Sequence, residues 1–162
     1  MGAAIGAVAG LAGGAFSALA SMRASQLAAR APLPEKIHEL NKTVVVLRGA
    51  LGTPTFNTAL KDFSLKWNDF IVHQKILAPS RRIGLLSDLV LAATVDNQIS
   101  ANDMVRVVGD SMAAVTEMIA QQSSHIFRWR ARMAERGITR RFRAAAIAGV
   151  KSPHLAAIAS EL

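Results

Sequence analysis

Apolar residues recur at intervals of three and four along most of this chain, and this spacing limits the possible folds more than any other feature. It places apolar side chains on one face of an α-helix, whereas a half-buried strand alternates apolar and polar residues. Runs of this kind cover residues 37–51 and 56–70, while residues 83–95 are almost uniformly apolar, as in a central, buried helix. The sequence therefore predicts an all-α protein.

A longer run predicts one extended helix that starts after Ser100 and continues to Met133. The spacing is kept by Val105, Val108, Met112, Val115, Ile119, Gln122, Ile126, Trp129 and Met133. This is the pattern of a helical-bundle or coiled-coil seam, so Trp129 is expected in the core. Gly137 is expected to end or kink the helix, and a short helix is expected over residues 138–150.

Prolines and serines predict where the other helices begin. Pro32 and Pro34 separate the opening segment from the next helix, and Ser80, Ser100 and Ser152 are expected to cap later helices. We expect a hydrophobic Gly/Ala-rich helical arm at residues 1–31 and a bundle domain at residues 32–162 with a basic C-terminal part. The fold class is then an N-terminal glycine-zipper helix plus a compact bundle of about five to six helices.

Glycine occupies every fourth position near the start of the chain. The small residues with this spacing are Gly2, Gly6, Gly10 and Gly14, followed by Ala18. On a helix they form a groove that lets another helix approach closely, and each interior glycine costs roughly 0.5–1 kcal/mol relative to alanine unless packing offsets it. The segment is therefore predicted to be an assembly element that contacts another copy or a different subunit.

The same segment is long enough to cross a bilayer. Residues 1–22 carry no charge, and about 20 residues of helix match a hydrocarbon core of roughly 30 Å. Glycine and serine make the segment only marginally hydrophobic, so insertion would require partner helices. Whether it spans, lies on or avoids a bilayer stays open.

The charge balance predicts an anionic partner. The 162 residues include 19 Lys and Arg but 11 Asp and Glu, which gives a formal net charge of +8. The chain has no cysteine, so disulfides, thiolate metal sites and cysteine nucleophiles are excluded. Nucleic acid, anionic lipid and an acidic protein surface all remain possible partners.

The positive charge is concentrated near the C-terminus. The candidate polyanion-binding residues are Arg128, Arg130, Arg132, Arg136, Arg140, Arg141 and Arg143, accompanied by the single acid Glu135. On a continuous helix, positions 128, 132, 136 and 140 share one face, and guanidinium groups match phosphate oxygens well. A solvated basic face and a protein interface are the alternatives to phosphate binding.

The sequence contains no convincing catalytic or metal-binding pattern. The histidines lie far apart, at His38, His73, His125 and His154, and none belongs to a two-histidine helical metal pair. The glycine-rich start lacks the preceding strand and the Lys-Ser/Thr of a phosphate loop. We expect no enzymatic activity, no cofactor and no bound metal.

The layout and several short segments resemble viral structural proteins. The Gly/Ala-rich start followed by a helical body is similar to the nucleocapsid shell proteins of enveloped double-stranded RNA phages, which implies a helical protein that self-assembles into a shell under an envelope. Residues 37–41 (IHELN), 50–52 (ALG) and 63–67 (FSLKW) are similar to fragments of the helical-bundle coat proteins of rod-shaped plant viruses. No RNA-binding residue is carried over from these coat proteins.

These observations favour a non-enzymatic structural assembly protein that self-associates through its N-terminal helix. A virion shell or coat component that contacts membrane or nucleic acid is the leading hypothesis, located in the virion. The partners are then further copies and other subunits of the assembly, with nucleic acid or an anionic membrane surface as a further candidate. The alternatives are a single-span, membrane-anchored accessory subunit of a larger membrane complex, and a nucleic-acid-binding helical module free of the membrane.

Overall fold

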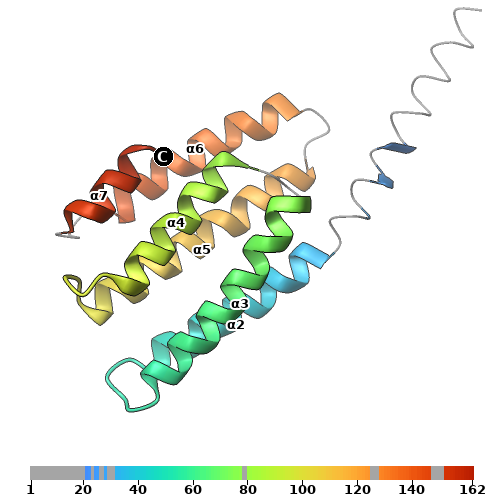
Figure 1. The fold of residues 1–162 in the computed structure, drawn as a ribbon. Helices are drawn as coiled ribbons and strands as arrows, with labels where there is room; N and C mark the ends of the chain where they lie inside the picture. The colour runs from blue at the N-terminus through green and yellow to red at the C-terminus, as the bar shows by residue number, and fades with distance from the viewer. Residues whose placement is uncertain are drawn as a thin grey trace, which may run out of the picture. The chain divides into compact units, whose positions relative to one another are not determined.

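The computed structural model describes residues 21, 22, 24, 25, 28, 32–77, 80–124, 128–146 and 152–162, and all regular structure among them is α-helical. The helices are α2 (Pro32–Gly49), α3 (Phe56–Leu77), α4 (Arg81–Val95), α5 (Ala101–Ser124), α6 (Arg128–Ala146) and α7 (Pro153–Ser160) (Figure 1). The predicted all-α class is confirmed for this part of the chain. The proposed glycine zipper of Gly2, Gly6, Gly10, Gly14 and Ala18 lies outside the described residues and stays a prediction.

The chain divides into two units, Met1–Pro32 and Leu33–Leu162. Apart from Pro32 itself, all the helices named above belong to the second unit. The described residues of the hydrophobic core also begin at Leu33. The second unit therefore has a core of its own.

Helix α4 lies at the centre of the second unit. It packs against α3, α5 and α7, and α5 in turn packs against α6. Figure 1 shows that α6 runs antiparallel to α5, and that α3, α4 and α7 lie side by side. The nearly uniform apolarity of α4 follows from this position, because a helix with neighbours on several sides needs more than one apolar face.

Three aromatic rings of α3 anchor it in the core. Phe63, Trp67 and Phe70 are each at most 1% exposed. The ring centroids of Phe63 and Trp67 are 5.9 Å apart, and those of Trp67 and Phe70 are 5.6 Å apart. Complete burial of a side chain of this size contributes about 1.5–3 kcal/mol. This aromatic row accounts for the spacing of three and four over residues 56–70.

The helix caps predicted at serine residues are confirmed. Ser80 and Ser152 each accept a hydrogen bond from the backbone N–H three residues further on, and Pro153 follows as the first residue of α7. The hydroxyl of Ser100 accepts the backbone N–H of Asp103 at 3.1 Å and donates to the Asp103 carboxylate at 2.8 Å. Each cap satisfies a backbone amide that has no partner within its helix.

Asp96 connects the end of α4 to the start of α7. Its carboxylate accepts the hydroxyl of Ser152 at 2.5 Å and the backbone N–H of Gln98 at 2.8 Å. These hydrogen bonds, that from Ser152 first, hold the pKa of the Asp96 carboxyl below its ordinary value of 3.8. The ionised Asp96 carboxylate therefore stabilises the fold at pH values above 3.8. This stabilisation is lost as the pH falls through the lowered pKa.

The prediction of one extended helix between Ser100 and Met133 is wrong. Helix α5 ends at Ser124, and α6 begins at Arg128 and runs back along α5. Residues 121–125 (QQSSH) include serine and histidine, which have low helix propensity. The apolar spacing continues past residues 121–125, but the residues that keep it do not lie on one continuous buried face.

Two further expectations for this region are also wrong. Gly137 does not end α6, which continues to Ala146, so residues 138–146 of the expected short helix belong to α6. Residues 147–150 of that expected helix lie outside the described residues. Trp129 is 57% exposed and Met133 is 60% exposed. Both side chains therefore lie on the outer side of α6, where the sequence had predicted them in the core.

Candidate anion-binding face of α6

Helix α6 has one buried side, which packs against the bundle. The buried residues recur at intervals of three and four: Ala131, Glu135, Ile138, Thr139 and Phe142. Ile138 and Phe142 belong to the hydrophobic core. Because the buried positions repeat with the helical period, the arginines whose side chains the structure describes on this helix turn outward.

Glu135 is the one acidic residue of α6, and it points inward. Its carboxylate accepts the side-chain amide of Gln122 on α5 at 2.7 Å and the hydroxyl of Ser80 at 3.4 Å. The guanidinium of Arg82 on α4 lies 3.8 Å from the second carboxylate oxygen. Only 8% of the Glu135 side chain is exposed, whereas 29% of the Arg82 side chain is. One carboxylate thus joins α4, α5 and α6.

These polar contacts keep the acid apart from the neighbouring arginines of its own helix. A buried carboxylate is costly unless it is paired and hydrogen-bonded, and Arg82, Gln122 and Ser80 satisfy it from other elements. This cluster was not predicted from the sequence. The available signals were the polar Gln122 in an apolar seam and the position of Glu135 four residues after Ala131 and three before Ile138.

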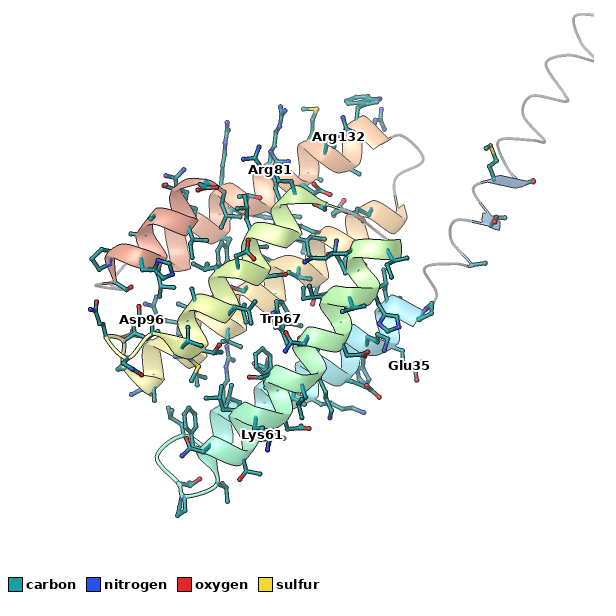
Figure 2. All side chains as sticks on the ribbon, viewed as in Figure 1. Glu35, Lys61, Trp67, Arg81, Asp96 and Arg132 are labelled. Atoms are coloured by element: carbon teal, nitrogen blue, oxygen red, sulfur yellow. The ribbon has the colours of Figure 1, made fainter. Side chains whose placement is uncertain are left out.

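The arginines of α6 lie on the opposite side. The exposed ones are Arg130, Arg132, Arg136, Arg140, Arg141 and Arg143. Figure 2 shows Arg132 on the outer side of α6, while Trp67 lies between helices in the bundle. The side chain of Arg128 lies outside the described residues. The predicted shared face of positions 132, 136 and 140 is therefore exposed.

Most of these arginines have no carboxylate partner among the described residues. Arg141 contacts Glu117 of α5 at 2.6 Å, between side chains that are 70% and 46% exposed. Within the described part of the chain, no carboxylate oxygen lies within 4.0 Å of the other exposed guanidiniums of α6, those of Arg130, Arg132, Arg136, Arg140 and Arg143. We call the exposed side of α6 that carries these five residues the arginine face.

Trp129 and Met133 lie within the arginine face, one helical turn apart. The guanidinium carbon of Arg130 is 5.3 Å from the centroid of the Trp129 ring, a cation–π contact. At about 100° per residue, Arg136 and Arg140 continue the line of Trp129 and Met133 along the helix. The face therefore combines an apolar pair with guanidinium groups around it.

The described residues contain no group of three or more His, Asp or Glu side chains placed to hold a metal ion. Within the same residues, no helix combines the length and the apolarity needed to cross a membrane. No protein-family model matches the chain, and no curated protein and no solved structure is significantly similar to it.

Proposed function

We propose that this chain is a non-enzymatic structural protein, a shell or coat component of a virion, whose bundle attaches to a phosphate-bearing partner through the arginine face. The observation that carries the proposal is the set of exposed guanidiniums of α6 without a carboxylate partner in the described chain. Guanidinium groups donate paired hydrogen bonds that fit the oxygens of phosphate esters. Further copies of the chain would be recruited through the glycines of the N-terminal segment.

The electrostatics of α6 favour an anionic partner over a merely solvated face. Arg132, Arg136 and Arg140 are spaced four residues apart, and each like-charged pair at this spacing destabilises a helix by about 0.2–0.5 kcal/mol. The nearest acid in sequence, Glu135, is already engaged by Arg82. A partner that brings negative charge to the face would turn this repulsion into attraction.

Replacement of Arg132, Arg136 and Arg140 by glutamine tests the proposal. Each basic residue near an anionic surface contributes about 1 kcal/mol, so the triple variant is expected to bind anionic vesicles or polyphosphate roughly 100-fold more weakly at low salt. Vesicle co-sedimentation and fluorescence anisotropy measure the two affinities. Undiminished binding at low salt would show that the arginines are only solvated.

A matched variant separates the arginine face from net charge. Lys42, Lys61 and Lys75 are exposed on α2 and α3, and their replacement by glutamine removes the same three positive charges. This control is expected to retain most of the binding, since its charges lie on other helices. Equal weakening in both variants would mean that overall charge, and not α6, determines the affinity.

A further inference from the structure

The arginine face has an apolar centre, and this restricts the kind of anionic partner. We propose that the partner is the surface of a lipid bilayer with anionic headgroups, into whose interfacial layer Trp129 and Met133 insert. The inference rests on the proposed function, because it names the ligand class of the same face. It is carried by the exposure of Trp129 (57%) and Met133 (60%) among guanidiniums that have no carboxylate partner in the described chain.

The order of residues around α6 fits a flat surface. At about 100° per residue, Arg132 and Arg143 lie on one side of the line through Trp129 and Met133, and Arg130 lies on the other. Helices that lie on membranes place apolar side chains at the boundary of headgroups and acyl chains and surround them with cations. The long aliphatic stems of arginine let each guanidinium stay at headgroup level while the apolar pair reaches deeper.

Trp129 suits this boundary in particular. Indole is apolar over its faces and carries one N–H donor, and tryptophan is enriched where membrane meets water. The guanidinium of Arg130, 5.3 Å from the ring centroid, places a phosphate-binding group directly beside the ring. Ring and cation can therefore contact the acyl boundary and a headgroup phosphate at the same time.

The same features argue for a bilayer over nucleic acid. A duplex presents phosphates and base edges but no apolar layer, so it would leave the exposed Met133 in water. Single strands are held by several aromatic side chains along a basic groove. In the described part of α6, Trp129 is exposed, whereas the other aromatic residue, Phe142, is buried in the core. Within the described residues of α6, a single exposed ring beside a methionine matches the bilayer better.

Tryptophan fluorescence of the full chain provides a local test. The protein has two tryptophans, and Trp67 is only 1% exposed, so it gives a constant background. On addition of vesicles of phosphatidylcholine and phosphatidylglycerol in equal parts, Trp129 emission should shift to the blue and be quenched by lipids with brominated acyl chains. Vesicles of phosphatidylcholine alone should cause neither change.

A paired substitution tests the contribution of the apolar centre. Trp129→Gln with Met133→Gln should weaken binding to the anionic vesicles by roughly tenfold or more, because the interfacial apolar contacts are lost. The matched control is Val72→Gln with Ile76→Gln, an apolar pair one turn apart on α3 that is 58% and 74% exposed. This control should bind the vesicles like the native chain.

The outcomes separate this inference from the proposed function. If the arginine-to-glutamine triple variant loses binding while bound Trp129 shows no blue shift and no quenching by brominated lipid, the bilayer insertion is overturned and phosphate binding stands. Tighter binding to single- or double-stranded RNA than to the vesicles, at equal phosphate concentration and salt, would also overturn it. If the triple variant binds like the native chain, the proposed function fails as well.

Discussion

Glu135 determines which side of α6 faces outward. Its carboxylate is shared among Gln122 of α5, Ser80 at the start of α4, and Arg82. Rotation of α6 about its axis would remove all of these contacts and expose Ile138 and Phe142 to water. The arginines are thus held outward both by their own solvation and by the burial of this one acid.

Replacement of Glu135 by alanine is expected to destabilise the bundle by about 2–3 kcal/mol. The change removes the counter-charge of the partly buried Arg82 guanidinium and the carboxylate to which the Gln122 side chain donates, and the loss of one partner of a largely buried ion pair costs several kcal/mol. Urea denaturation followed by circular dichroism measures the loss.

The control is the exposed ion pair between Glu117 and Arg141. Glu117→Ala should cost less than about 1 kcal/mol, because water screens a pair whose side chains are 46% and 70% exposed. Similar losses for Glu135→Ala and Glu117→Ala would show that burial of the carboxylate does not contribute to the stability of the bundle.

At the scale of the helix, α6 contains a glycine that its packing does not require. A Cβ atom added at Gly137 would meet no other atom within 4 Å, although the residue lies in the interior of the helix. Glycine in such a position costs roughly 0.5–1 kcal/mol relative to alanine. Gly137→Ala should therefore raise the free energy of unfolding by about this amount, as measured by thermal or urea denaturation.

Gly52 provides a control for which the opposite change in stability is expected. It lies in the turn between α2 and α3 with φ of +75°, a left-handed conformation that side chains with a Cβ rarely adopt. Gly52→Ala is expected to lower the stability by about 1–2 kcal/mol. If both substitutions changed the stability in the same direction, helix propensity and backbone conformation would not explain the role of glycine at these positions.

The helices that could be predicted from the sequence are those with local start signals. Ser80, Ser100 and Ser152 identify their helices because a cap depends on residues a few positions apart. The apolar spacing over residues 37–51 and 56–70 likewise predicts α2 and α3. For α4, uniform apolarity was enough to place it centrally.

The division between α5 and α6 could not be read from the same spacing. A helical repeat shows which residues share a face but not whether the chain turns back between them. Trp129 and Met133 keep the repeat while lying exposed, because the register that matters in α6 is set by Glu135, Ile138 and Phe142. Contacts with α4 and α5 therefore determine that register, and the local sequence does not.

At the scale of the whole molecule, the second unit should fold without the first. The described core begins at Leu33, and the unit that contains it extends to Leu162. Deletion of residues 1–31 should leave the helical content of the remaining chain and its cooperative unfolding nearly unchanged, as measured by circular dichroism during heating. Aggregation or a non-cooperative transition would show that the N-terminal segment is part of the core.

A longer deletion provides the control for the deletion of residues 1–31. Removal of residues 1–40 would also remove Leu33, Ile37 and Leu40, which are each at most 5% exposed. The loss of these buried side chains should cost several kcal/mol, at about 1.5–3 kcal/mol each. A sharp decrease in the midpoint temperature is expected for this deletion only.

The contact between α4 and α7 also bears on the order in which the molecule assembles during synthesis. The other main pairings, α3 with α4, α4 with α5, and α5 with α6, join helices that are neighbours along the chain, whereas α7 reaches back past two helices. Contacts between sequence neighbours form first because little chain must be closed into a loop. While the ribosome is still translating α7, one apolar flank of α4 thus remains open, and exposed apolar surface of this kind lets nascent chains associate wrongly.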